Sequence, residues 1–123
     1  MIVLEAILLP QRFRLKSKFD FGKAYRHGQS RANSYLVLYF FARRKETAVL
    51  ENPRIGFSVS KKLGNAVVRN KIKRRLRAAI KPYLRLIRQD VDIIFIARKK
   101  IKGIPFSDVE KNMIYLLKKS GLL

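Results

Sequence analysis

The stretch of the sequence with the clearest chemical character is a basic run from Lys61 to Arg77. Between Asn52 and Gln89 the chain carries twelve Lys or Arg residues and no Asp or Glu. A solvated helix surface usually mixes both signs, because opposite charges one turn apart attract and like charges repel. A surface of one sign is stabilised by an external polyanion. The run therefore predicts binding to nucleic acid rather than a simple solvated face, and it favours nucleic acid over an anionic membrane.

Two aromatic residues form a second candidate for binding chemistry. Phe21 and Tyr25 lie one turn apart in a segment that reads as a helix. Taken alone, such a pair more often packs into a core. The alternative is that the rings stack on nucleobases, since aromatic faces accept any base. The residues by themselves favour the core.

Residues for protein-based catalysis are not found together in the sequence. The chain has no cysteine, one histidine (His27) and eight scattered carboxylates, of which Asp90 and Asp92 are the nearest pair. Neither a Gly-rich phosphate loop nor a Ser/His/Asp spacing occurs. We therefore predict no catalytic residue, no metal ligand and no small-molecule substrate for the protein alone. The lack of cysteine fits a reducing compartment, and we expect a cytoplasmic protein.

The basic run is predicted to lie on an amphipathic helix that Gly64 and Asn65 open. Apolar residues at helical spacing form one face, and Pro82 should end or kink the helix because it lacks the N–H group. The apolar face comprises Val68, Ile72, Leu76, Ala79 and Tyr83. The opposite face carries Asn70, Lys73, Arg74, Arg77 and Lys81.

The other elements follow from capping residues and from apolar alternation. Ser17 should cap a helix that ends near His27, and Ser107 with Glu110 should form a capping box for a last helix that Gly121 closes. Arg43 to Pro53 reads as a polar connection. The predicted strands are Ser34 to Ala42, Arg54 to Ser60 and Val91 to Ala97. Asp92 interrupts the last strand, and either a helix-facing salt bridge or a position at the entry of the strand is its expected explanation.

Length and composition indicate one folded domain. The chain has 123 residues, 48% of them hydrophobic, and a net charge of +21 that is spread from Arg12 to Lys119. A disordered basic tail would be less hydrophobic. We predict a single domain over residues 1–123, with residues 1–9 as a loosely ordered N-terminal extension.

The stretch from Ser58 to Arg74 closely resembles the signature of the protein subunit of bacterial ribonuclease P. Phe21-x-x-x-Tyr25-x-His27-Gly28 and the segment Asp92 to Arg98 match the same family, and the resemblance covers about Leu15 to Leu117. Lys71 stands where the family usually has arginine. This difference keeps the charge but loses the planar fork that suits bidentate phosphate contacts.

The resemblance implies an α/β (α+β) two-layer sandwich with the element order α-β-β-β-α-β-α. It also implies a four-stranded sheet, which requires a short strand near Arg31 to Asn33 that the residue pattern does not reveal. A left-handed β-α-β crossover around the central helix belongs to the same expectation, although general statistics favour right-handed crossovers.

The resemblance further implies a subunit that assists a catalytic RNA in removing the 5′ leader from precursor tRNA. The residues expected to bind the catalytic RNA are Arg69, Asn70, Lys71, Lys73, Arg74 and Arg77. The residues expected to line a cleft for the single-stranded leader are Phe21, Tyr25 and Tyr39, and Lys61 and Lys62 would add basic contacts. This reverses the preference for a core role of the first two aromatics. Magnesium would be bound mainly by the RNA.

Two other functions remain open at this stage. A structural RNA-binding protein, of the ribosomal type, would explain the charge equally well. A DNA-binding protein is less favoured, because no helix-turn-helix spacing or dimer seam is visible.

Overall fold

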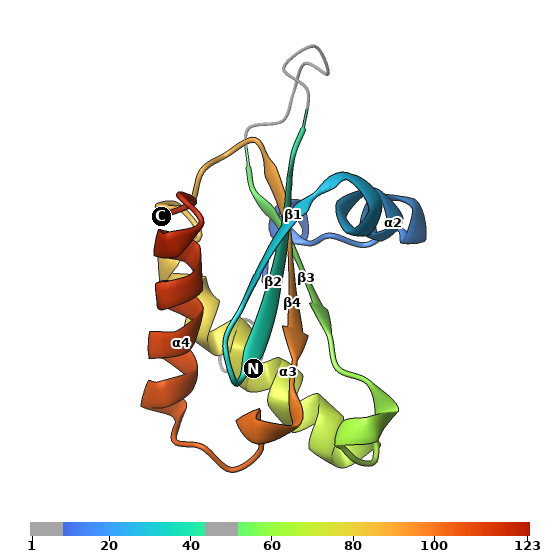
Figure 1. Cartoon of the computed structure of the whole chain (residues 1–123), viewed down its shortest axis with the longest axis vertical. Helices are drawn as coiled ribbons and strands as arrows, with labels where there is room; N and C mark the ends of the chain where they lie inside the picture. The colour runs from blue at the N-terminus through green and yellow to red at the C-terminus, as the bar shows by residue number, and fades with distance from the viewer. Residues whose placement is uncertain (1–8, 44–51) are drawn as a thin grey trace.

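The computed structural model describes residues 9–43 and 52–123. Within these residues the helices and strands follow the order α-β-β-β-α-β-α, which confirms the expected mixed α+β fold (Figure 1). They are α2 (Lys18–His27), β1 (Gln29–Ala32), β2 (Leu36–Ala42), β3 (Arg54–Ser58), α3 (Ala66–Ile80), β4 (Val91–Ala97) and α4 (Phe106–Lys119). Short 3-10 turns are η1 (Gln11–Phe13), η2 (Lys61–Leu63), η3 (Lys81–Tyr83) and η4 (Lys99–Ile101).

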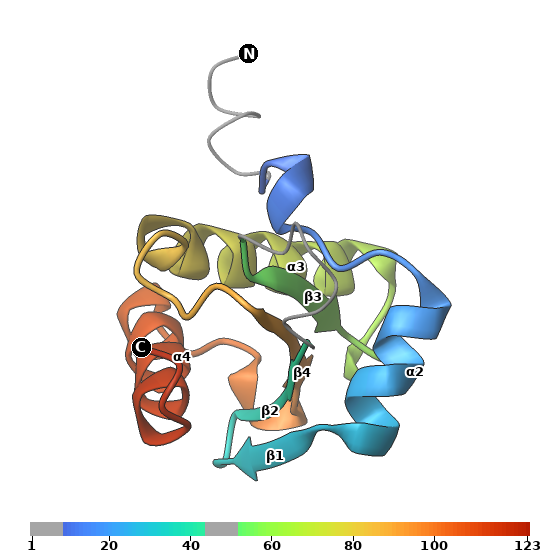
Figure 2. The same cartoon turned by 90° about the horizontal axis from the view of Figure 1, so that it is seen from above.

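The four strands form one sheet in the order β1-β2-β4-β3. β2 pairs antiparallel with β1 and with β4, whereas β3 pairs parallel with β4. The chain passes from β3 through α3 to β4 in the left-handed sense that the resemblance implied (Figures 1 and 2). The sheet therefore has β3 at one edge, close to α3.

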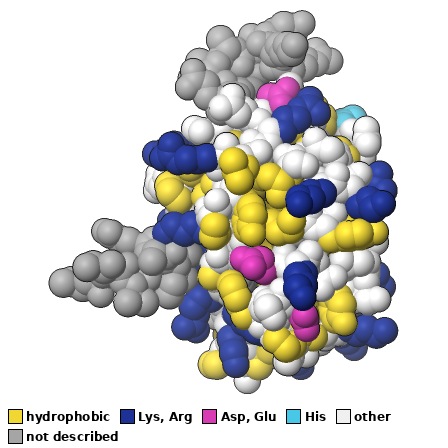
Figure 3. Space-filling view, turned by 90° about the vertical axis from the view of Figure 1, so that its left-hand side faces the viewer, with side chains coloured by type: hydrophobic (Ala, Val, Ile, Leu, Met, Phe, Trp, Pro, Cys, Tyr) yellow, Lys and Arg dark blue, Asp and Glu magenta, His cyan; other side chains and the backbone are white. Residues whose placement is uncertain are grey.

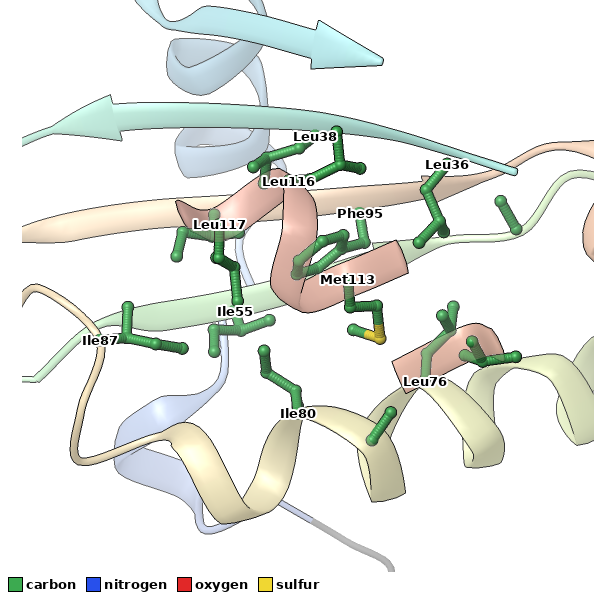
Figure 4. Close-up of a cluster of buried hydrophobic side chains, with 14 of the residues drawn as sticks. Leu36, Leu38, Ile55, Leu76, Ile80, Ile87, Phe95, Met113, Leu116 and Leu117 are labelled. Atoms are coloured by element: carbon green, nitrogen blue, oxygen red, sulfur yellow. The ribbon is translucent and has the colours of Figure 1, made fainter. Parts of the chain in front are cut away.

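The main hydrophobic core lies between the sheet and the helices α3 and α4, which cover the same face (Figure 2). Leu36 and Leu38 of β2 and Phe95 of β4 point towards Leu76 and Met113 of the two helices (Figure 4). The predicted apolar spacing explains this packing, because residues three or four positions apart share one helix face. The buried residues of α3 are Ile72, Leu76, Ala79 and Ile80.

Helix α2 lies against the opposite face of the sheet, where a smaller core contains Leu15, Ala24 and Ile94. The helix begins where expected: the Ser17 side chain accepts a hydrogen bond from the Asp20 N–H at 3.0 Å. Just before it, the Leu15 N–H donates to the Ile55 carbonyl at 3.0 Å, which ties the N-terminal segment to the free edge of β3.

Two predicted helix ends are confirmed and one helix start is wrong. α3 ends at Ile80, two residues before Pro82, and Gly121 follows α4 with a positive φ of 73°. However, α4 begins at Phe106, and the Pro105 carbonyl accepts the Asp108 N–H at 2.9 Å. Ser107 therefore lies inside the first turn and does not cap the helix.

The first residue of the predicted polar connection, Arg43, and the last residue of the expected N-terminal extension, Leu9, are more buried than expected. Arg43 is 7% exposed and Leu9 is 2% exposed, where Leu9 belongs to the main core. The rest of the expected extension, residues 1–8, and residues 44–51 of the connection lie outside the described residues.

Candidate nucleic-acid interface

Helix α3 presents a basic surface whose start is fixed by two residues. The Asn65 side chain accepts the Val68 N–H at 3.0 Å and so caps the helix. Gly64 before it has a φ of 147°, a backbone conformation that residues other than glycine rarely adopt. Since the first turn of α3 has no acidic residue, the cap leaves the positive end of the helix dipole next to positive side chains.

The six residues expected to bind catalytic RNA lie on this helix at different depths. Asn70, Lys71 and Arg74 are exposed. Arg69, Lys73 and Arg77 are half-buried. Arg69 turns back towards the helix start, where its Nε donates to the Gly64 carbonyl at 3.2 Å. The basic surface is therefore continuous with the turn that opens the helix.

A neighbouring arginine, Arg75, has a structural contact instead. Its Nη2 atom donates to the Ile104 carbonyl at 2.8 Å, which links α3 to the segment before α4. Arg75 was not among the residues expected to bind RNA.

None of the cations of α3 forms an ion pair with a carboxylate in the described part of the chain. The ion pairs found there join Arg43 and Arg54 to Asp92, Arg54 to Asp20, and Arg88 to Asp90. Acidic side chains of the described residues therefore do not neutralise Arg69, Arg74 and Arg77. Their charge is available to a ligand.

The three aromatic residues expected to hold the leader lie close together on the α2 side of the sheet. The ring centroids of Phe21 and Tyr25 are 6.4 Å apart, and those of Tyr25 and Tyr39 are 5.1 Å apart in an edge-to-face arrangement. Tyr25 is 40% exposed, whereas Phe21 and Tyr39 are half-buried. Tyr25 therefore offers the most accessible ring of this aromatic cluster, and the other two rings support it.

The sheet residues beneath the aromatic cluster leave room for the Phe21 ring. Tyr39, Ile94 and Gly56 are aligned across β2, β4 and β3. A side-chain carbon at Gly56 would lie 2.3 Å from the Phe21 ring, so only glycine lets this ring approach the strand. Partial burial raises the pKa of the Tyr25 hydroxyl, and its hydrogen bond to Ser58 opposes that rise. Tyr25 is thus neutral at physiological pH and does not repel a phosphate.

Lys61 and Lys62, the expected additional contacts, are exposed in the η2 turn directly before α3. Lys62 also lines a wide hollow of about 830 Å³ at the end of the sheet, together with Arg98, Lys99 and Lys100. The sequence signal for this second basic surface was the cation run after β4. This run does not reveal the surface by itself, because its position beside Lys62 depends on the fold.

Two acidic side chains, Asp92 and Asp20, bind arginines that do not belong to α3. Arg54 binds Asp92 through two hydrogen bonds, Nε to Oδ1 at 2.8 Å and Nη2 to Oδ2 at 2.7 Å, and reaches Asp20 of α2 at 3.3 Å. Arg43 binds the same Asp92. The hydrogen bond to Asp92 raises the pKa of Arg54, which remains charged. The salt bridge expected for Asp92 is therefore confirmed.

Residues that would hold a metal ion are not grouped in the described ranges, where no three His, Asp or Glu side chains lie close enough together. Among the same residues, no helix is long and apolar enough to cross a membrane.

Comparison with known proteins identifies one matching family. Residues 9–121 match the family described as Ribonuclease P. The chain is 40% identical to the ribonuclease P protein component of Streptococcus pneumoniae (strain Hungary19A-6), over 93% of this chain and 89% of that relative. Among solved structures it is similar to the RNase P protein of Staphylococcus aureus, with a TM-score of 0.79 and 39% identity, covering 89% of this chain and 96% of that one. It is also similar to the RNase P protein of Thermotoga maritima, with a TM-score of 0.76 and 31% identity, covering 86% and 96% respectively.

Proposed function

Because the chain belongs to the family of ribonuclease P protein components, we propose that it binds the catalytic RNA through α3 and the 5′ leader of precursor tRNA through the aromatic cluster. Family membership itself implies a role in the 5′ maturation of tRNA, a place in the ribonuclease P holoenzyme and a partnership with its RNA. The contacts on this chain, and the cytoplasmic localisation, belong to the proposal.

The observation that carries the proposal is the cationic surface of α3, which no carboxylate of the described chain neutralises. Each phosphate that such a surface neutralises releases condensed counterions from the RNA, which favours binding and makes it dependent on salt. Since the helix is anchored by its buried stripe and by Arg75, the backbone that carries these cations is already fixed before the RNA arrives. Binding then requires no ordering of this backbone.

The aromatic cluster supports a role in holding a single strand. Unstacked bases of single-stranded RNA bind aromatic faces with little sequence preference, and leaders differ in sequence between precursors. The exposed ring of Tyr25 would accept a base, while Phe21 and Tyr39 fix its orientation. The two binding surfaces together would position the precursor on the RNA that cleaves it.

We expect the magnesium of the holoenzyme to be bound mainly by RNA phosphates. This cation prefers carboxylate, phosphate and water oxygens. The α3 surface offers only amide and cationic side chains, so the residues of this surface do not fit a protein-held magnesium site. We therefore assign no step of the cleavage to a metal on the protein, and no catalytic residue to the chain.

Reconstitution tests the proposal. Purified protein is mixed with the cognate catalytic RNA and labelled precursor tRNA at low magnesium concentration. We expect no cleavage by the protein alone and restored cleavage in the mixture. Cleavage by the protein alone, or a mixture no more active than the RNA alone, would contradict the proposal.

A further inference from the structure

Beside the outer edge of β3, two cations of α3 lie near two cations of the N-terminal segment. A hollow of about 220 Å³ is bounded there by the N-terminal segment, by β3 and by α3 (the β3-edge hollow). Arg14 and Lys16 line it from the N-terminal segment, and Lys73 and Arg77 line it from α3. Lys73 and Arg77 were expected to contact RNA, whereas Arg14 and Lys16 were not.

Among residues 9–43 and 52–123, no carboxylate lines the β3-edge hollow, and none of its four cations forms an ion pair. Arg14 and Arg77 line the same hollow from opposite sides, and burial together with the charge of Arg14 lowers the pKa of the Arg77 guanidinium. Gathering like charges in a partly enclosed space is unfavourable without a counter-charge. The hollow therefore has the character of an anion site.

Hydrogen bonds hold the N-terminal segment, which carries Arg14 and Lys16, in place. The Arg14 Nε donates to the Leu9 carbonyl at 2.6 Å, and the Leu15 N–H donates to the Ile55 carbonyl at 3.0 Å. Because the segment is attached to β3 on one side and buried through Leu9 on the other, its backbone keeps Arg14 and Lys16 opposite α3. A ligand would meet a backbone arrangement that is already formed.

The size of the hollow limits what it can accept. Sites for drug-sized ligands usually measure about 300–1,000 Å³. About seven water volumes of roughly 30 Å³ each would fill the β3-edge hollow. A phosphate group and the adjoining sugar fit this space and this charge better than a whole small-molecule ligand.

The hollow shares one wall with the aromatic cluster. The Phe21 ring lines the hollow and also lies 6.4 Å from the Tyr25 ring. Gly56 allows this shared position, since a side chain there would displace the Phe21 ring. A strand that stacks on Tyr25 and a phosphate in the hollow would therefore be neighbours.

We propose that the β3-edge hollow binds one backbone phosphate of RNA, held between Arg14 and Lys16 on one side and Lys73 and Arg77 on the other. This inference deepens the proposed function and rests on it. The phosphate can come from the catalytic RNA or from the leader of the precursor, and the two sources differ in a binding experiment.

The test uses the full-length protein with Arg14→Gln and Lys16→Gln combined, and a control with Lys111→Gln and Lys118→Gln combined. The control removes the same charge from exposed positions of α4. Dissociation constants are measured over a salt series for the catalytic RNA, and for leader-bearing and mature tRNA bound to the holoenzyme. Circular dichroism confirms that each variant is folded, and Lys16→Gln with Lys73→Gln replaces the first pair if the loss of Arg14 prevents folding.

We expect the hollow variant to lose about tenfold in affinity. The slope of log Kd against log salt should fall by about 0.7 to 0.9, the value for one phosphate, while the control changes neither quantity. A loss for the catalytic RNA assigns the phosphate to that RNA, and a loss confined to leader-bearing tRNA assigns it to the leader.

A hollow variant that equals the control for all RNAs, while Arg69→Ala still weakens binding, would overturn the proposal and leave the proposed function intact. A wild-type protein that binds the catalytic RNA no better than an unrelated RNA of equal length would instead refute the proposed function.

Discussion

Two regions of this molecule use basic side chains in opposite ways. In the first (the Asp92 network), Arg43 and Arg54 bind the carboxylate of Asp92, and Arg54 also reaches Asp20. Asp92 is 1% exposed, so its charge depends on these partners. In the second region, the α3 surface, no carboxylate of the described residues forms an ion pair with a cation.

The difference shows which cations maintain the fold and which are available to a ligand. A buried carboxylate needs its cations, because an uncompensated charge in the interior is strongly unfavourable. Exposed cations without partners contribute no comparable stability and repel one another. The side of the molecule that carries α4 is intermediate, since acidic side chains lie among the basic ones there (Figure 3). The absence of acids is thus a property of the α3 surface rather than of every surface.

The largest expected effect on stability is in the Asp92 network. Replacing Asp92 with Ala would leave Arg43 buried without a counter-charge, and we expect the free energy of unfolding to fall by about 3–5 kcal/mol. Urea unfolding followed by circular dichroism measures this change. Asp90→Ala is the matched control, because its partner Arg88 is half-exposed and such pairs contribute less than about 1 kcal/mol. Equal losses for the two variants would show that the Asp92 network does not differ from a surface ion pair.

A smaller effect is expected in the aromatic cluster. Tyr25→Ala should weaken the holoenzyme's binding of leader-bearing precursor by about tenfold, because stacking of one base contributes about 1–3 kcal/mol. Mature tRNA, which lacks the leader, should bind unchanged. Tyr39→Ala should show the same selectivity with a smaller loss, since Tyr39 acts by supporting Tyr25. Equal losses for both tRNAs would remove these residues from the leader site.

The smallest expected effect concerns the stability of the α3 surface itself. Arg74→Ala removes one of several like charges from an exposed helix position. We expect the free energy of unfolding to stay constant or to rise by up to about 0.5 kcal/mol, with the gain disappearing at high salt. A fall of more than about 1 kcal/mol would mean that Arg74 has a structural partner and that the contrast between the two regions is weaker than described.

The sequence predicted the elements with strong hydrophobic patterns. The apolar positions of α3, β3 and β4 follow helix or strand spacing, and these elements lie where they were expected, except that β3 ends at Ser58 rather than Ser60. Strand β1 gives no such pattern, because all four of its residues are exposed. It was expected only through the family resemblance. Similarly, β2 begins at Leu36 rather than Ser34, because the Asn33 side chain accepts the N–H groups of Tyr35 and Leu36 in a turn.

The candidate site could be predicted in part for the same reason. The α3 cations are contiguous in sequence, so their common face follows from helical spacing. The burial of Arg43 was not predictable, because its partner Asp92 is 49 residues away along the chain. The β3-edge hollow was missed because Arg14 and Lys16 come opposite Lys73 and Arg77 only when the N-terminal segment pairs with β3.

The central claim is that the unpaired cations of α3 hold the catalytic RNA. Its most direct test is the slope of log Kd against log salt for binding of the catalytic RNA by wild-type protein and by a variant with Arg69→Ala, Arg74→Ala and Arg77→Ala. We expect the variant to remain folded, to bind about a hundredfold more weakly at low salt, and to lose about two to three from the slope. A folded variant with the affinity and slope of the wild type would contradict the claim.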